Sequence, residues 1–213
     1  MKQDLVEKLI EFFSEFKLHK YKKGEILYRQ GDYIHDVAFI KSGYVRLYTV
    51  LSSGREVTIN LFKPVFIITL MYSLQDRESP YFMEAVTEVE IWKAPKTRVL
   101  DVIKEDVDVT LEILSHSFKV LDKVLENVED TSGSAGQKVA SLLLSLAKAS
   151  VSKRGIAEIE FSMTKRVIAS LAGITRETAT LEIKKLEGKG LLRLERDKVI
   201  ILSLTKLREY ADL

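Results

Sequence analysis

The sequence contains no cysteine, which excludes disulfide bonds, thiolate metal sites and cysteine-bound iron–sulfur clusters. It has little histidine, and the three residues are His19, His35 and His116. It also lacks long hydrophobic runs, since the longest, from Val65 to Tyr72, is far too short to cross a bilayer. No N-terminal stretch has the charged-then-apolar layout of a signal peptide. We therefore expect a cytoplasmic protein that does not enter the membrane.

The 213 residues, 46% of them hydrophobic, are enough for one large domain or two modest ones. The net charge of +2 hides an asymmetry. From Lys138 onward there are 15 Lys and Arg against 9 Asp and Glu, a charge of +6, which leaves 18 against 22, or −4, for the preceding part. A basic C-terminal third beside an acidic body is typical of a nucleic-acid-binding module attached to a sensor, although random scatter also produces such differences.

Proline and glycine are absent from residues 107–128, where apolar residues recur at alternating intervals of four and three. This spacing predicts a coiled-coil helix, roughly 33 Å long, whose narrow seam joins two copies of the chain. The alternative is a helix buried within a monomer, which normally shows a wider apolar face. A second, weaker apolar row can pack against the chain's own domain. The predicted dimer seam comprises Val107, Leu111, Leu114, Phe118, Leu121, Leu125 and Val128.

Before this helix, the apolar period falls towards two, which is the pattern of short strands separated by turns. Turn signals occur at Gly31-Asp32, at Lys41-Ser42-Gly43 and at Ser52-Ser53-Gly54. We predict an antiparallel barrel or roll, preceded by an amphipathic helix over residues 3–16 and followed by a helix that Pro95 opens. Residues 82–86 and 89–92 are expected to form a strand pair. The other predicted strands are 25–28, 37–40, 45–50 and 57–61.

The C-terminal part begins after the small, flexible segment 131–136, the best domain boundary in the chain. Two short helices then meet at Gly173-Ile174, and Thr175 caps the second, which predicts a helix-turn-helix. Residues 191–194 and 199–202, joined by a charged turn, predict a β-hairpin wing. Glycine turns are common in purely structural helix pairs, but the turn, the wing and the positive charge together indicate DNA binding.

Three segments, in this order, resemble the CRP/FNR family of bacterial transcription regulators. Residues 21–32 resemble its opening strand and turn, residues 39–48 its next hairpin, and residues 174–178 the start of its recognition helix. The resemblance extends from about Tyr21 to Leu202. It implies a regulator rather than an enzyme, with an effector-sensing β-roll, a dimerising helix and a winged helix-turn-helix that binds a two-fold promoter site in double-stranded DNA. It also implies contact with RNA polymerase.

The predicted fold class is accordingly α+β. An N-terminal antiparallel β-roll (a double-stranded, jelly-roll-like β-helix) with its first helix occupies residues 1–103. A dimerisation helix follows at 104–130, then a hinge at 131–137, and a winged helix-turn-helix domain at 138–213.

The helix that begins after Thr175 packs through Ala179, Ile183 and Leu186, so its other face points outward. Arginine pairs with guanine O6 and N7 in the major groove, and glutamate accepts a hydrogen bond from cytosine N4. Where the family usually has a second arginine, this chain has a leucine, which contacts a thymine methyl instead, so we expect a half-site different from the common one. The predicted base readers are Arg176, Glu177, Thr180 and Leu181. The predicted phosphate contacts are Thr164, Lys165, Arg166, Thr178 and Lys184.

Cyclic-nucleotide pockets of this family hold the ribose with a Gly-Glu pair and the phosphate with an Arg-Ser or Arg-Thr pair. In this chain the pairs fall on Thr69-Leu70 and near Ser79-Pro80, so the phosphate would lack its arginine and we expect no cyclic nucleotide. The surrounding residues predict a pocket for an unknown small apolar or aromatic effector, or they simply fill the core. The predicted pocket residues are Leu61, Phe66, Ile68, Leu70, Met71, Tyr72, Tyr81, Phe82, Val120 and Val124.

Other functions would require particular metal-ligand or cofactor-ligand residues in the sequence. A haem protein needs axial ligands, for which only the three histidines are present, and a cupin-like metal enzyme needs His and carboxylate ligands clustered on its strands, which the strand segments do not supply. We therefore expect no metal and no cofactor. A third alternative keeps the DNA-binding module and makes the β-roll a purely structural partner without a ligand.

Overall fold

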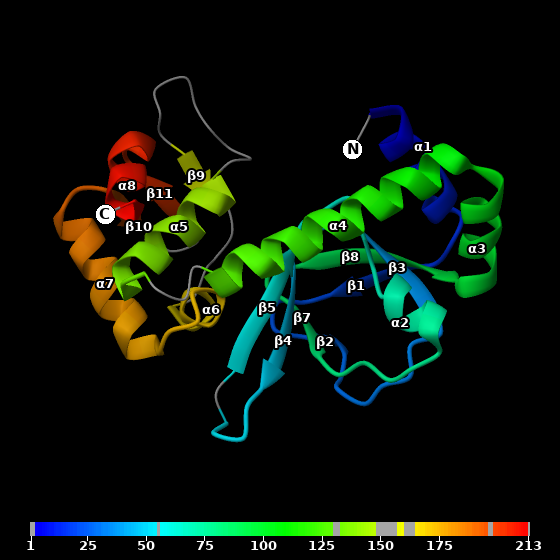
Figure 1. Cartoon of the computed structure of the whole chain (residues 1–213), viewed down its shortest axis with the longest axis horizontal. Helices are drawn as coiled ribbons and strands as arrows, with labels where there is room; N and C mark the ends of the chain where they lie inside the picture. Colours follow the sequence, from blue (N-terminus) through cyan, green and yellow to red (C-terminus); the bar gives the residue numbers. More distant parts are fainter. Residues whose placement is uncertain are drawn as a thin grey trace. The chain divides into compact units, whose positions relative to one another are not determined.

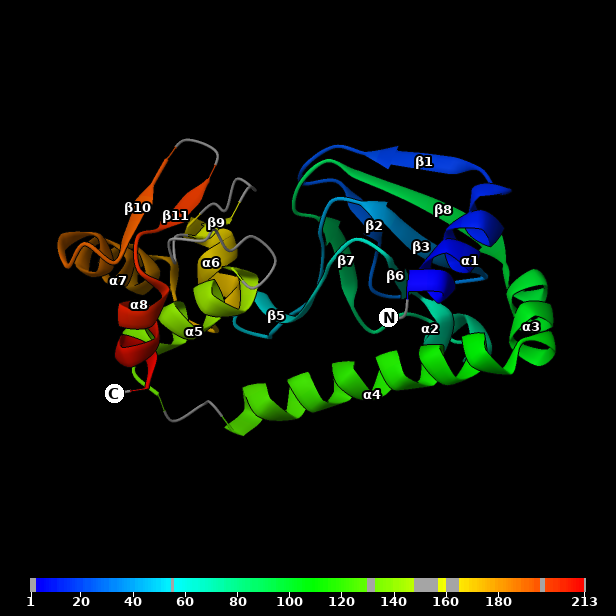
Figure 2. The same ribbon diagram turned by 90° about the horizontal axis from the view of Figure 1, so that it is seen from above.

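The structure is a computed structural model that describes residues 3–54, 56–129, 133–147, 157–159, 165–195 and 198–212. The chain forms two compact units, one of Met1–Gly54 and Ile59–Glu126 and the other of Arg55–Thr58 and Asn127–Leu213, so that the main division falls within the long helix α4 (Val107–Glu129). Figures 1 and 2 show the elements of each unit from two directions. Among the described residues, no helix is long and apolar enough to cross a membrane. The domain boundaries expected from the sequence stay a prediction.

The N-terminal unit contains two four-stranded antiparallel sheets, with the strand orders β1-β8-β3-β6 and β2-β7-β4-β5 (Figure 2). They form the predicted antiparallel roll. The strands are β1 (Leu18–Tyr21), β2 (Ile26–Tyr28), β3 (Asp36–Ser42), β4 (Val45–Val50), β5 (Glu56–Phe62), β6 (Phe66–Ile68), β7 (Phe82–Ala85) and β8 (Val89–Pro95).

Strand β3 is buried on both faces because its alternating side chains enter two cores. Ala38 and Ile40 pack between the two sheets, in a core that includes Met83 of β7. Val37 and Phe39 point the other way and pack with helices α1 (Gln3–Ser14) and α3 (Lys96–Glu105) and with the start of α4. The burial of both faces explains why this strand is a continuous apolar run.

The expected strand pair at 82–86 and 89–92 requires a correction. Both segments are strands, but β7 pairs with β2 and β4, whereas β8 pairs with β1 and β3, so they belong to different sheets. The residues that connect β7 to β8 pack closely against the turn at Gly43, where an added Cβ would lie 2.1 Å from the carbonyl oxygen of Glu88. Strand β6 and helix α2 (Leu70–Gln75) were not predicted as elements.

The C-terminal unit contains helices around a small antiparallel sheet of strand order β10-β11-β9 (Figures 1 and 2). Helices α6 and α7 form the predicted helix-turn-helix, and strands β10 and β11 form the predicted wing. The last helix, α8, was not predicted. The elements are α5 (Ala135–Ala147), β9 (Ala157–Ile159), α6 (Lys165–Leu171), α7 (Arg176–Gly188), β10 (Leu192–Leu194), β11 (Val199–Ile201) and α8 (Leu204–Ala211).

Gly136, which the sequence analysis assigned to the hinge, is instead buried in the first turn of α5. The Ser134 hydroxyl accepts a hydrogen bond from the Gln137 N–H, and the Gln137 side chain accepts one from the Ser134 N–H, which forms a capping box. A Cβ on Gly136 would lie 2.6 Å from Tyr210 Oη and 2.8 Å from Glu182 Oε2. The glycine therefore permits close packing. Residues 131–132 of the expected hinge lie outside the described residues.

Candidate nucleic-acid interface and ligand cavity

The turn between α6 and α7 is held by backbone hydrogen bonds. Gly173 has a φ of 66°, a conformation that glycine adopts without steric cost. The next N–H, that of Ile174, donates to the carbonyl oxygen of Ala169 at 3.0 Å. The Thr175 hydroxyl then accepts a hydrogen bond from the Thr178 N–H at 3.2 Å, which confirms Thr175 as the N-cap of α7. This turn fixes the direction in which α7 leaves α6.

Helix α7 has one buried face and one exposed face. The predicted packed face is confirmed, since Ala179, Ile183 and Leu186 are at most 1% exposed. Arg176 and Glu177 are exposed in the first turn of the helix. The first turn of a helix also presents free backbone N–H groups, which favour an anion such as a DNA phosphate.

Two further predicted base readers lie on the second turn of α7. Leu181 is 60% exposed, an unusual position for a leucine on an otherwise polar helix face. Thr180 is half-buried, and its hydroxyl donates to the Arg176 carbonyl oxygen at 2.8 Å. That hydroxyl therefore remains available as an acceptor. Base reading by these four residues stays a prediction.

The predicted phosphate contacts are divided between α6 and α7. Lys165 and Arg166 are the first two residues of α6, half-buried and exposed respectively. On α7, Lys184 is exposed, and the hydroxyl of the half-buried Thr178 is 2.9 Å from that of Thr175. The remaining predicted contact, Thr164, lies outside the described residues.

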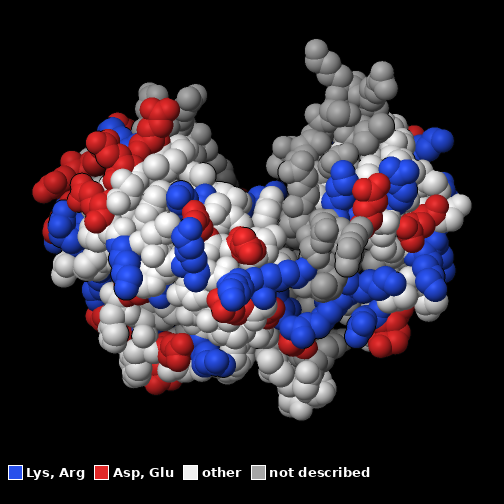
Figure 3. Space-filling model, turned by 180° about the vertical axis from the view of Figure 1, so that it is seen from behind, with Lys and Arg blue, Asp and Glu red and all other residues white. Residues whose placement is uncertain are grey.

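The wing is attached to α7 and carries basic residues that the sequence analysis did not single out. The Glu187 carboxylate of α7 accepts a hydrogen bond from the Leu194 N–H at 2.9 Å. In the wing, Arg193 and Lys198 form ion pairs with Glu195 at 3.1 and 3.9 Å. Figure 3 shows lysine and arginine side chains spread over the C-terminal unit, whereas acidic side chains gather at one end of the N-terminal unit.

Helix α4 presents two different rows of side chains, as its sequence predicts. In the outer row, the predicted dimer seam, the five members whose side chains are described are between 48% and 68% exposed. In the second row, Val109 is buried and Ile113 packs against the core formed with α1 and α3. The side chains of Leu125 and Val128 of the seam and of Val124 lie outside the described residues.

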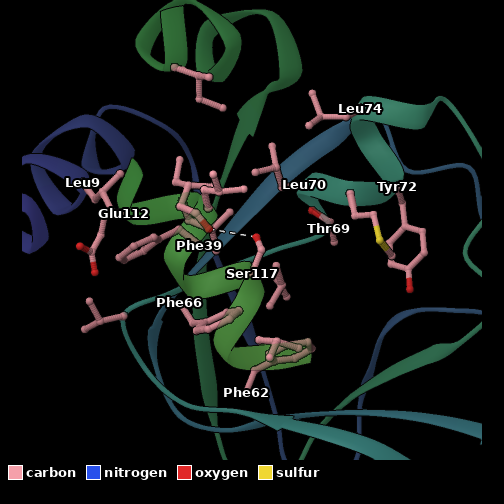
Figure 4. Close-up of a pocket in the computed structure, with 18 of the residues that line it drawn as sticks. Leu9, Phe39, Phe62, Phe66, Thr69, Leu70, Tyr72, Leu74, Glu112 and Ser117 are labelled. Atoms are coloured by element: carbon pink, nitrogen blue, oxygen red, sulfur yellow. Dashed lines mark hydrogen bonds between the residues drawn. The ribbon is translucent and has the colours of Figure 1, made fainter. Parts of the chain in front are cut away.

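The second row of α4 also forms one wall of a cavity of about 560 Å³ within the N-terminal unit. The opposite wall comes from the β6–α2 segment and the floor from the roll (Figure 4). In that view Leu9 and Glu112 lie at one end, Tyr72 at the other and Ser117 between them. The lining is mainly aliphatic and aromatic.

The cavity brings together six of the ten predicted pocket residues, namely Phe66, Ile68, Leu70, Met71, Tyr72 and Val120. Three others lie elsewhere: Leu61 is buried in β5, Tyr81 packs against the core between the sheets, and Phe82 stacks on Tyr48 with ring centroids 5.2 Å apart. The side chain of the tenth, Val124, is outside the described residues. Ligand binding by these residues stays a prediction.

The sequence analysis predicted Tyr72 in the cavity but missed the polar residues that α4 contributes. Thr110 and Ser117 lie on α4 with the spacing of one helix face, together with Ile113 and Val120. The sequence signal that could have identified them was the presence of these two polar residues on the same face of α4 as Ile113 and Val120. Burial raises the pKa of Tyr72 to about 12, with a further contribution from Tyr81, so its phenol stays neutral near pH 7.

Comparisons with known proteins cover both units. Residues 18–106 match the cyclic nucleotide-binding domain family, and residues 137–210 match the Crp-like helix-turn-helix domain family. A global nitrogen regulator of Nostoc sp. is 24% identical over 185 residues, 85% of this chain and 83% of that protein. The transcriptional activator FnrA of Stutzerimonas stutzeri is 26% identical over 190 residues, 85% of this chain and 75% of that protein. The structure of FixK2 from Bradyrhizobium japonicum superposes with a TM-score of 0.78 at 19% identity, over 92% of this chain and 96% of that one.

Proposed function

Because the chain belongs to the CRP/FNR family of DNA-binding transcription regulators, we propose that it acts as a homodimer that binds a two-fold promoter site under the control of a small effector. The family also favours contact with RNA polymerase and a cytoplasmic location.

The observation that carries the DNA-binding proposal is the exposed face of α7. A capped helix start, fixed against α6, projects Arg176, Glu177 and Leu181 away from the core. Their side chains suit guanine, cytosine and the thymine methyl, respectively, in the major groove. Each good base contact contributes about 1–3 kcal/mol of discrimination. Lys165 and Lys184 contribute through phosphates, which position the protein without reading sequence.

The exposed apolar seam of α4 supports the homodimer. A row of large apolar side chains at heptad spacing loses contact with water when it packs against its copy. A two-fold dimer presents two recognition helices, which suits two half-sites about one helical turn apart.

The cavity between α4 and the β6–α2 segment supports a sensory role for the β-roll. We place the effector there and expect it not to be a cyclic nucleotide, because the family's ribose-binding and phosphate-binding pairs fall on Thr69-Leu70 and near Ser79-Pro80 in this chain. The effector shifts the population between arrangements of the DNA-binding units. The alternative is an effector-independent regulator, which thermal-shift screening distinguishes, since a ligand of the folded state raises the melting temperature.

Selection of DNA sites from a random pool by the purified protein tests this function. We expect a two-fold motif whose half-site centres lie about 34–36 Å apart. Arg176→Ala should relax the preference at one base pair per half-site, whereas Lys165→Ala should weaken binding to all sites evenly and lower its salt dependence. Absence of any enriched motif, with and without cell extract, would contradict the proposal.

A further inference from the structure

Three hydroxyl groups in the cavity wall, those of Thr69, Thr110 and Ser117, donate hydrogen bonds to backbone carbonyls. Thr69 donates to the Asp36 carbonyl at 3.0 Å, and Ser117 donates to the Ile113 carbonyl at 2.9 Å, the bond drawn in Figure 4. Thr110 donates to the carbonyl oxygens of Ile103 and Asp106. Thr69 also accepts a hydrogen bond from the Ala38 N–H at 3.0 Å. Since these three hydroxyls have already given their protons to carbonyls, the side-chain donors left in the described lining are neutral, namely the Tyr72 phenol and the Gln75 amide, which are weaker partners for an anion than a charged donor.

The charged side chain in the described lining of the cavity is a carboxylate, that of Glu112. A negative charge brought into this apolar space loses its hydration, and the described lining contains no lysine, arginine or histidine to compensate it. The nearby Arg77 guanidinium lies over the Tyr72 ring, 5.4 Å from its centroid, and is not part of the lining. The described lining therefore offers an anion no charged partner in exchange for its hydration.

The rest of the wall favours apolar contact. Phe39, Phe62 and Phe66 contribute aromatic surface, and leucine, isoleucine, valine and methionine side chains provide most of the remainder. A volume of about 560 Å³ lies within the range of small-molecule sites in proteins. Apolar surface buried here stabilises a complex by about 25 cal/mol per Å².

From these contacts we propose that the cavity binds an uncharged, largely apolar molecule and excludes carboxylate and phosphate ligands. The proposal rests on the proposed function, in which this cavity is the effector site. A polar group on the ligand, where there is one, donates a hydrogen bond into the cavity, for example to the Ser117 oxygen.

Two pairs of probes, each matched in shape and differing in charge, test this proposal by calorimetry on the full-length protein. They are naphthylmethanol against naphthoate and decanol against decanoate. We expect each alcohol to bind at least about tenfold more tightly than its acid, since an unpaired buried charge is costly. Equal or tighter binding of an acid would overturn the proposal, and so would the binding of no probe, as expected if a partner's side chains fill the cavity.

A charge added to the cavity provides a second test. Ser117→Arg places a guanidinium in the wall, and we expect naphthoate to bind this variant at least about tenfold more tightly than it binds the wild type. Thr97→Arg makes the same kind of change at an exposed position of α3 and should leave naphthoate binding unchanged. An equal effect of both variants would overturn the proposal. If Ser117→Arg does not fold, the wild-type comparison decides.

Failure here is distinguishable from failure of the proposed function. The site selection reports on α7 and on the dimer alone. An enriched two-fold motif combined with tight acid binding would keep the regulator and reject the ligand class.

Discussion

At the residue scale, Leu181 is the clearest departure from a purely polar DNA-reading surface. Its side chain is 60% exposed on the second turn of α7, on the same face as Glu177 and Lys184. Single exposed leucines are common on protein surfaces, so exposure alone assigns no role. Its place on a helix face that we propose enters the major groove makes a thymine methyl its natural partner.

Replacing thymine by uracil in the selected site removes only that methyl group. We expect the uracil facing Leu181 to lower wild-type affinity about fourfold, since one buried methyl contributes about 0.8 kcal/mol. Leu181→Ala should lose this sensitivity, whereas Lys184→Ala should bind more weakly and keep it. Titrations of the four protein–DNA combinations measure the effect, and equal uracil sensitivity in the wild type and Leu181→Ala would refute the contact.

Gly136 allows α5 to pack closely against side chains of α7 and α8. An added Cβ would approach Tyr210 Oη at 2.6 Å and Glu182 Oε2 at 2.8 Å, so both side-chain ends must shift, and Gly136→Ala should lower the free energy of unfolding by about 1 kcal/mol. Gly188→Ala has open space around it and should be neutral or stabilising by about 0.5–1 kcal/mol. Urea unfolding compares the two variants. Equal free energies of unfolding would show that the structure around Gly136 accommodates the added methyl group without loss of stability.

At the element scale, the side chain of Asp106 caps the N-terminus of α4. Asp106 accepts hydrogen bonds from the backbone N–H groups of Asp108 and Val109 at 3.0 and 3.1 Å, and from Lys8 at 2.7 Å. The hydrogen bond from Lys8, followed by that from Val109, holds the pKa of Asp106 below its usual value. The cap therefore depends on the charged carboxylate.

This cap has a pH dependence of defined sign. A carboxyl group whose pKa is lowered by folding stabilises the protein above its ordinary pKa, and this contribution is lost as the pH falls through the folded-state value. Asp106→Ala should therefore lower the melting temperature at pH 7, and its difference from the wild type should shrink in acid. Asp101→Ala, at an exposed position of α3, is the control. A difference that does not change with pH would show that the charge of Asp106 does not matter.

At the scale of the whole molecule, the homodimer that we propose depends on the outer row of α4. Replacing Leu111 and Phe118 together by lysine should give a monomer in analytical ultracentrifugation, because four charges would face one another across the seam. The monomer should lose more than about 100-fold in affinity for a complete two-fold site and little for a single half-site. Thr97→Lys should remain dimeric, and a dimeric double variant would place the interface elsewhere.

The match of residues 18–106 to the cyclic nucleotide-binding domain family describes the fold of this unit and does not by itself name a ligand. The roll and the long helix create the cavity, and Thr69, Ser117 and Glu112 are among the polar side chains that line it. Proteins that share a fold can bind different ligands, so the ligand has to be argued from the side chains that line the cavity.

Local sequence periodicity was sufficient to predict many of the helices and strands of this protein. The heptad spacing of α4, the packed face of α7 and the Thr175 cap could be predicted because each depends on residues within a few positions of one another. The roll followed from short alternating strands, and the resemblance to a family followed from motifs in a fixed order.

Only the tertiary structure decided features that depend on which distant segments meet. It placed β7 and β8 in different sheets and made a cavity out of α4 and a segment some 45 residues earlier, from Val65 to Gln75. It also buried Arg46 completely, with its guanidinium paired to Glu84 on the adjacent strand at 2.5 Å, where the sequence shows an ordinary alternating strand. The periodicity of a sequence shows which face of a helix or strand is buried. It does not show which segment that face packs against, because the free energy of burial depends on the apolar area removed from water and not on the separation of the two segments in the sequence.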